Sequence, residues 1–234
     1  MQLENKKVVV LGGSSGIGLA AAELAKSHGA KIIIASRQRE RLERVAAEIG
    51  ATAIVADITS DEDVRNLFER CGPIDHVVLT AATLNTGPFK SLPMEKARET
   101  MEGKFWGTWR VARMADFRPG GSLTIVSGFL SIRPRIEAAV VGAANGAVEA
   151  LVKSLAIEMA PIRINAVSPG IVDTPLRAGM PEEARRAMLD DIAAALPVGR
   201  VGTSDDIARQ IMTCMEVGFM TGSVIFLDGG GSFA

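Results

Sequence analysis

Three glycines near the start of the chain have the spacing of a loop that binds phosphate groups. Gly12, Gly16 and Gly18 occur in LGGSSGIG, between an apolar run expected to be a strand and a helical pattern. In this context the first glycine permits a tight turn, the second lets the backbone approach a pyrophosphate, and the third lets the helix pack on the strand. Free N–H groups at the helix start then face the phosphates. The pattern indicates a dinucleotide site, although an ordinary glycine-rich turn has the same letters.

The end of the second apolar run bears on which dinucleotide is bound. A free ribose 2′-hydroxyl usually meets an acid at this point, whereas this chain has Ser36 and Arg37, with Arg39 nearby. A guanidinium can bind a 2′-phosphate through two hydrogen bonds. We therefore expect NADP(H) rather than NAD(H); the alternative is a surface arginine that opens a charged helix. Asp57 ends the third apolar run and is expected to face the adenine, or to be a plain strand-end carboxylate.

Apolar runs and helical patterns alternate along the whole chain. The runs are continuously apolar, which is typical of a parallel sheet covered on both faces. Strand–helix repeats of this length predict right-handed crossovers and a doubly wound sheet. We expect seven strands, long helices over about 94–115 and 138–159, and a helical excursion over 175–197. The predicted fold is a single α/β domain of the Rossmann type over residues 1–234, with the excursion as a lid that governs substrate choice.

Composition excludes several classes of protein. Hydrophobic residues make up 47% of the 234 residues, which excludes a disordered chain. A formal net charge of -1 gives no excess of positive charge with which to bind nucleic acid or an anionic membrane. Cys71 and Cys214 have no metal-ligand spacing, so we expect two reduced thiols and no metal site. The apolar run at the N-terminus is too short for a signal peptide, and we expect a soluble cytoplasmic protein without a transmembrane helix.

Motifs along the whole chain resemble those of the short-chain dehydrogenase/reductase family. They are GGSSGIG, VADIT, IVSG, GAVEALVKSLAIEMAP, RINAVSPGIVDTP and MTGSVIFLDGGG. The resemblance implies a single Rossmann domain, often a tetramer, that transfers hydride between a nicotinamide and a carbonyl or alcohol. It also implies that a Pro-Gly turn and a following threonine hold the nicotinamide end. The residues expected to bind the cofactor are Gly12, Ser14, Ser15, Gly16, Ile17, Gly18, Ser36, Arg37, Arg39, Asp57, Ile58, Ala81, Ala82, Pro169, Gly170, Val172 and Thr174.

The departures from the family pattern fall where the family carries out its chemistry. The family's tyrosine, which passes a proton to the carbonyl oxygen, aligns with Val141. Its lysine, which lowers the pKa of that tyrosine and holds the ribose, aligns with Asn145. The serine that orients the substrate aligns with Gly128, and an asparagine of the proton relay aligns with Lys104. The chain contains no tyrosine at all, so the Ser-Tyr-Lys triad of the family is degenerate here.

Three functions are compatible with a retained cofactor loop and a lost acid. The first is an NADP(H)-dependent oxidoreductase that acts on a small carbonyl or imine-type substrate, using another acid, water, or a substrate that is already electrophilic. General acid–base catalysis is worth about 10²–10⁴ in rate, so its loss need not abolish hydride transfer. The second is a catalytically silent NADP(H)-binding protein, either a sensor or a partner subunit. The third is a cyclase or lyase in which the nucleotide is structural.

Few side chains can replace the missing acid. The candidates are Lys104, Ser127, Ser131 and Asn145. Lys104 could stabilise developing negative charge if it points into the site, or it could lie along its helix or at a subunit contact. The two serines could equally be strand-end or turn residues. We expect a small-molecule substrate, no nucleic-acid or membrane partner, and a homo-oligomer, dimer or tetramer, that uses the long helices as contact surfaces.

Overall fold

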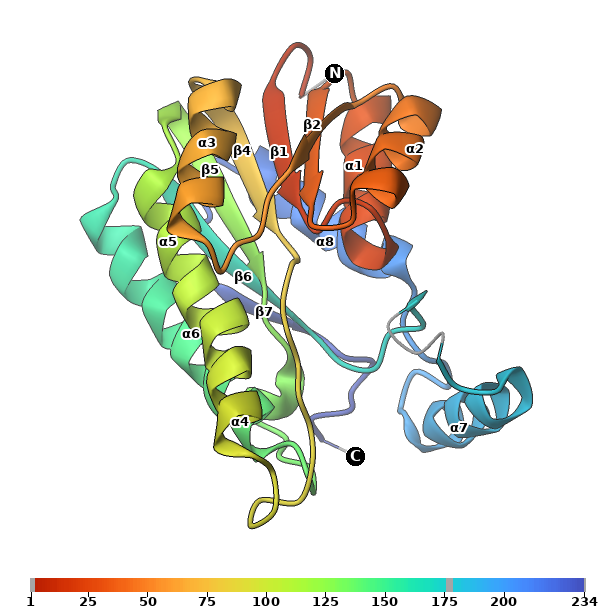
Figure 1. Ribbon diagram of the computed structural model, residues 1–234. Coiled ribbons are helices and arrows are strands. Elements are labelled where there is room, and N and C mark those ends of the chain that lie inside the picture. Colours follow the sequence, from red (N-terminus) through yellow and green to blue (C-terminus); the bar gives the residue numbers. More distant parts are fainter. Residues whose placement is uncertain (1–2, 176–178, 234) are drawn as a thin grey trace.

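The computed structural model describes residues 3–175 and 179–233, and its centre is a seven-stranded parallel sheet (Figure 1). The strands are β1 (Lys7–Leu11), β2 (Lys31–Ser36), β3 (Thr52–Val55), β4 (Ile74–Leu79), β5 (Phe117–Val126), β6 (Arg163–Pro169) and β7 (Val224–Leu227). Their order in the sheet is β3-β2-β1-β4-β5-β6-β7. The chain therefore reverses its direction of winding between β1 and β4, and the loops after these two strands diverge to leave a crevice. The prediction of a Rossmann-type doubly wound sheet is confirmed.

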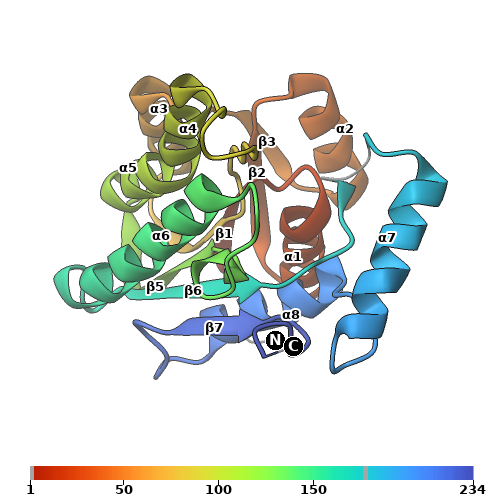
Figure 2. The same cartoon turned by 90° about the horizontal axis from the view of Figure 1, so that it is seen from below.

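Helices cover both faces of this sheet, as Figures 1 and 2 show. One face is covered by α1 (Gly16–Ser27), α2 (Arg39–Ile49) and α8 (Ser204–Glu216). The opposite face is covered by α3 (Asp61–Cys71), α5 (Gly107–Met114) and α6 (Ala139–Glu158). Each layer forms one buried apolar cluster with the strand residues that face it.

The apolar strands contribute to both clusters at once. Val8 and Val10 of β1 lie in the cluster beneath α1, whereas Val9 and Leu11 lie in the opposite one. This follows because successive side chains of a strand point to opposite faces of the sheet. Both faces are covered, so both sets of residues must be apolar, and this is the physical reason for the continuous apolar runs in the sequence.

The long helix expected over 94–115 contains a π-helical turn in its middle. α4 (Met94–Met101) leads into the π-helical turn Glu102–Trp106, and α5 follows directly. Lys104 lies in this turn and is only 5% exposed. The turn thus places a charged side chain in the interior of the protein. π-Helical turns are frequent at functional sites.

The excursion expected over 175–197 contains α7 (Glu182–Ala195), which lies at the side of the molecule (Figure 2). Residues 176–178 of this excursion lie outside the described residues. Arg185 of α7 forms an ion pair with Asp173, which follows β6. Leu189 is the one buried residue of α7. This small apolar contact is compatible with movement, and the lid remains a prediction.

The helix α6 is apolar because it belongs to the core. Among the described residues it is the one helix whose length and composition would allow it to span a membrane. Val148 and Val152 are fully buried in the cluster that α6 forms with the sheet. Packing against the strands accounts for these positions, and 39% of the most apolar window of α6 is buried.

Candidate functional site

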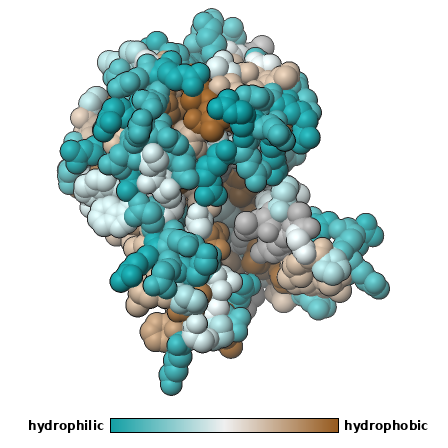
Figure 3. Space-filling model, in the orientation of Figure 1, coloured by the Kyte–Doolittle hydropathy of each residue, from teal (hydrophilic) through white to brown (hydrophobic). Residues whose placement is uncertain are grey.

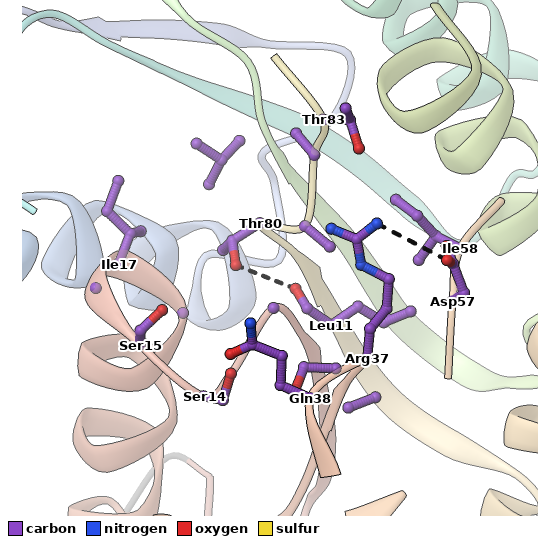
Figure 4. A pocket seen from close by; sticks show the side chains of 18 of the residues that line it. Leu11, Ser14, Ser15, Ile17, Arg37, Gln38, Asp57, Ile58, Thr80 and Thr83 are labelled. Atoms are coloured by element: carbon purple, nitrogen blue, oxygen red, sulfur yellow. Dashed lines mark hydrogen bonds and ion pairs between the residues drawn. The ribbon is translucent and has the colours of Figure 1, made fainter. Parts of the chain in front are cut away.

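A cavity of about 420 Å³ opens at the crevice between β1 and β4. The loops after β1, β2, β3 and β4 form its walls (Figure 4). Figure 3 shows a hollow with apolar atoms on this side of the molecule, surrounded by hydrophilic residues. The cavity brings together most of the residues expected to bind a cofactor, namely Gly12, Ser14, Ser15, Gly16, Ile17, Gly18, Ser36, Arg37, Asp57, Ile58, Ala81, Ala82 and Thr174.

Two of the three glycines of the loop, Gly12 and Gly18, lie where a side chain does not fit. Gly12 has a φ of 88°, and a Cβ at this position would overlap the hydroxyl oxygen of Thr80. A Cβ on Gly18 would overlap the carbonyl oxygen of Gly12. A Cβ on Gly16, by contrast, would meet its nearest neighbouring atom only at 3.6 Å, so the space beside this residue is open. The Ser15 side chain does not cap α1, so the first N–H groups of that helix are available to an anion.

The part of the cavity at the ends of β2 and β3 holds an ion pair and a hydroxyl without a partner in the described chain. Arg37 extends across the cavity toward Asp57, with 3.8 Å between the charged atoms (Figure 4). The other carboxylate oxygen of Asp57 accepts hydrogen bonds from the backbone N and the hydroxyl of Thr59, at 2.9 and 2.8 Å. Asp57 is thus fixed in place. The Ser36 hydroxyl is buried and has no partner in the described part of the chain, as expected where a polar ligand completes a site.

Four of the expected cofactor residues do not line this cavity. Arg39 does not line the cavity; it pairs with Glu43 at 3.2 Å on the exposed face of α2. Arg41 lines the cavity in its place. Residues two apart on a helix point about 200° apart, so the choice between the two arginines depended on where α2 begins. The other expected residues outside the lining follow the strand β6, and they are Pro169, Gly170 and Val172.

The three positions expected to align with the family's triad lie at the end of β5 and the start of α6, and none of them carries an acid. The side-chain Nδ2 of Asn145 donates a hydrogen bond to the carbonyl oxygen of Gly128 at 3.0 Å. A Cβ on Gly128 would lie 2.8 Å from the same nitrogen. Val141 and Asn145 are 4% and 2% exposed, and neither lines the cavity. We call residues 128, 141 and 145 the catalytic corner, after the family positions with which they are expected to align; Val141 and Asn145 are packed in the interior, whereas Gly128 is partly exposed.

A buried carboxylate lies behind the catalytic corner, and sequence reasoning missed it. Glu149 is one helical turn beyond Asn145 and is 8% exposed. Its Oε1 accepts hydrogen bonds from the hydroxyls of Ser127 and Ser131, both at 2.9 Å, and of Ser168 at 3.1 Å. The helical spacing of residues 141, 145 and 149 places all three on one face, and this was the available signal. Glu149 thus ties the ends of β5 and β6 to α6.

Lys104 faces the end of β5 rather than the cavity. Its ammonium donates hydrogen bonds to the carbonyl oxygens of Val126 at 2.7 Å and Ser127 at 3.2 Å. Burial lowers the pKa of Lys104 to about 8, and the charge of Glu149 opposes this shift. The candidates Lys104, Ser127 and Ser131 therefore belong to one buried polar cluster, in which each already has a partner.

A second cavity of about 430 Å³ adjoins the first. Thr174 and Pro175 line both cavities, and Met180 and Arg185 come from the side of α7. A segment that closed over this shared wall would cover the end of the first cavity. Described residues of the excursion therefore border the end of the first cavity, and its role as a lid stays a prediction.

Comparisons with known proteins agree with this geometry. The family model described as Enoyl-(Acyl carrier protein) reductase matches residues 12–232. Short-chain dehydrogenase/reductase ATR9 from Stachybotrys chlorohalonatus is 30% identical over 97% of both chains. This chain belongs to the short-chain dehydrogenase/reductase family. A solved small-chain dehydrogenase in complex with NADPH has a TM-score of 0.86 at 35% identity, covering 99% of this chain and 100% of the other. MalC Reductase/Diels-Alderase from Malbranchea aurantiaca has a TM-score of 0.91 at 28% identity, covering 98% and 97%.

Membership of the short-chain dehydrogenase/reductase family makes this chain an oxidoreductase-type protein with a nicotinamide cofactor. The cavity residues fit such a group. The glycine loop leaves room for a pyrophosphate at Gly16, and α1 presents uncapped N–H groups there. The hydroxyl of Ser36, without a partner in the described residues, lies where β2 ends, in the wall of the cavity. The lining of this cavity therefore fits a nicotinamide cofactor.

Proposed function

We propose that this chain binds NADP(H) and transfers hydride to or from a small carbonyl or imine-type substrate, without the tyrosine that its family uses as acid. The observation that carries the proposal is the cavity at the β1–β4 crevice, in which arginines and serines surround the end of β2. Positive charge at this place favours a ribose 2′-phosphate over a free 2′-hydroxyl.

Each part of the cavity would hold one part of the cofactor. The N–H groups at the start of α1 would bind the pyrophosphate. Arg37 and Arg41 would surround the ribose phosphate, Asp57 would border the adenine, and Thr174 would lie toward the nicotinamide. When bound, the nicotinamide ring supplies or accepts the hydride, and the protein supplies binding and orientation.

The residues of the catalytic corner leave a substrate oxygen without an acid. Val141 and Gly128 have no proton to donate. The ammonium of Lys104 is engaged by two backbone carbonyl groups. A ketone that accepts hydride develops negative charge on oxygen and needs a proton, whereas an iminium ion becomes a neutral amine without one. We therefore expect imine-type substrates to react better than ketones, with alignment of the reactants providing much of the rate.

A catalytically silent NADP(H)-binding protein is the second candidate. The burial of Val141 and Asn145, outside the lining of the cavity, favours it. A sensor or a partner subunit needs a nucleotide site but no open catalytic corner. This candidate explains the loss of several catalytic groups by a single cause.

Two measurements test these proposals. Calorimetry with NADPH, NADP⁺, NADH and NAD⁺ measures cofactor binding, and NADPH oxidation with a panel of carbonyl compounds and imines measures chemistry. Turnover that disappears in the variant Gly18→Val, whose side chain would fill the glycine loop, supports the oxidoreductase. Tight NADPH binding without any turnover supports the silent protein. Failure of both phosphorylated coenzymes to bind would overturn both candidates.

We further propose that the protein is a single-domain, cytoplasmic homo-oligomer without a nucleic-acid, metal or membrane partner. Trp106 and Trp109 on the α4–α5 run are 46% and 41% exposed, and Ile157 on α6 is 81% exposed. Exposed apolar side chains on these helices support an oligomer contact. Cys71 and Cys214 are free and buried, as in a reducing compartment. Light scattering after gel filtration measures the assembly, and a monomer would contradict this part.

A further inference from the structure

Arg41 differs from the arginines around it in having no carboxylate partner. Arg37 pairs with Asp57, Arg39 pairs with Glu43, and Arg44 pairs with Glu48. Within residues 3–175 and 179–233, Arg41 forms no ion pair, and its one hydrogen bond runs from Nε to the backbone carbonyl oxygen of Ser14, at 3.1 Å. Arg41 is therefore a cation without a carboxylate partner in the described residues, and it lies at the wall of the cavity.

The bond to Ser14 fixes the Arg41 guanidinium against the glycine loop. Arg41 is half-buried, Ser14 is 8% exposed, and both line the cavity. Since Nε is used, the fork formed by Nη1 and Nη2 keeps its donors for a ligand. A half-buried charge without a partner is unfavourable, and an anion bound in the cavity would remove that penalty. A planar fork matches a phosphate group through two parallel hydrogen bonds.

Arg37 is less well placed than Arg41 to bind a phosphate group. Its side chain is 62% exposed and is directed toward Asp57. Asp57 is itself held by Thr59, so it does not move away. A phosphate that bound Arg37 would have to compete with this carboxylate and would lie close to its negative charge. Arg41 has no such competitor.

We propose that Arg41, positioned by the carbonyl group of Ser14, is the residue that selects a dinucleotide with a 2′-phosphate. The inference rests on the proposed binding of NADP(H) and assigns its selectivity to one side chain. The ligand group is a phosphomonoester dianion on the adenosine ribose. Ser36, whose buried hydroxyl has no partner in the described chain, supplies a further donor beside it. Arg37 then acts at the adenine side, together with Asp57.

The test compares adenosine 2′,5′-bisphosphate with AMP, which differ only in the 2′-phosphate. Calorimetry on the full chain gives the affinity ratio of the two probes. Arg41→Gln is expected to weaken the bisphosphate about 10- to 100-fold, as loss of charge-assisted hydrogen bonds does, while AMP binding changes little. Arg39→Gln is the matched control, because it removes the same charge from the same helix outside the cavity. It is expected to leave the ratio as in the wild type.

The outcomes separate this inference from the proposal on which it rests. If Arg41→Gln keeps the wild-type ratio of affinities for the bisphosphate and AMP, the inference is overturned. The same holds if only Arg37→Gln loses this ratio. In both cases the proposed binding of NADP(H) stands. Equal binding of both probes by the wild type would overturn the preference for NADP(H) itself. Circular dichroism checks folding, and Arg41→Lys provides a second variant. It keeps the charge but lacks the fork, so an unreduced ratio in this variant would also count against the inference.

Discussion

Asn145 donates its side-chain amide to the carbonyl oxygen of Gly128 at 3.0 Å, so that two positions aligned with the family's triad hold each other. The backbone at Gly128 is extended, with a φ of 168°, a conformation that any residue can adopt. A side chain there would crowd Asn145, because its Cβ would lie 2.8 Å from the amide nitrogen, so the Asn145 side chain would have to shift to admit it. The two replacements are therefore physically coupled.

This coupling predicts that a serine at position 128 depends on residue 145. Gly128→Ser alone is expected to lower the free energy of unfolding by about 1–3 kcal/mol, because the added atoms overpack against the amide. In an Asn145→Ala background the same change should cost less. Urea unfolding of both single variants and the double variant gives the coupling energy. Simple additivity of the two changes would contradict the crowding.

Restoring ketone reduction is expected to need four changes rather than three. Gly128→Ser, Val141→Tyr and Asn145→Lys rebuild the triad, but Lys104 would then leave a second ammonium at the end of β5. Adding Lys104→Asn removes that charge. The quadruple variant should reduce ketones with NADPH about 10²–10⁴ faster than the wild type, the usual effect of a general acid, and faster than the triple variant. Continued inactivity at unchanged NADPH affinity would count against the alignment of α6 with the family.

The fold and the glycine loop could be predicted because their signals are local. The run KKVVV, the glycines after it and the following helix are adjacent in sequence, so the strand, the loop and α1 could be inferred together. The degenerate triad stays a prediction, which rests on the spacing of Val141 and Asn145 from IVSG and from each other.

The remaining parts of the site depend on relations that sequence does not carry. The choice between Arg39 and Arg41 required the phase of α2, which is set by its first residue. The cluster around Glu149 required the distance between β5, β6 and α6, whose residues are far apart in the chain. Ser168 carries no signal of its own, because a buried hydroxyl at the end of a strand is common and only its acceptor makes it part of the cluster.

Glu149 is expected to stabilise the folded protein through the three serine hydroxyls that it accepts. Glu149→Leu would leave Ser127, Ser131 and Ser168 without this acceptor, and each orphaned hydroxyl costs about 1–3 kcal/mol. Ser127 and Ser131 have weaker alternatives at 3.4 and 3.3 Å, the carbonyl groups of residues 145 and 128, so their costs lie at the low end. Urea unfolding measures the loss.

The control for Glu149 is another glutamate on the same helix. Glu158→Leu changes an exposed position at the end of α6 and should alter stability by less than about 0.5 kcal/mol. Glu149→Gln keeps one acceptor oxygen and should fall between Glu149→Leu and the wild type. Equal stability of Glu149→Leu and Glu158→Leu would show that the serines find other partners at no cost.

Lys104 predicts a dependence of stability on pH with a definite sign. Burial lowers the pKa of Lys104 from 10.5 to about 8, so between these pH values the unfolded chain holds a proton that the folded chain has lost. Stability therefore rises with pH across this window, by up to about 3 kcal/mol from this one group. The free energy of unfolding of the wild type minus that of Lys104→Met should therefore increase from pH 8 to pH 10.

Two comparisons control for other groups. Cys71, whose pKa is raised to about 11 by burial, acts in the opposite direction, but it is present in both proteins and its effect cancels. Lys153→Met, at an exposed position on α6, should give no such slope, and a slope of zero for Lys104→Met as well would mean that the buried ammonium keeps its proton across the whole window.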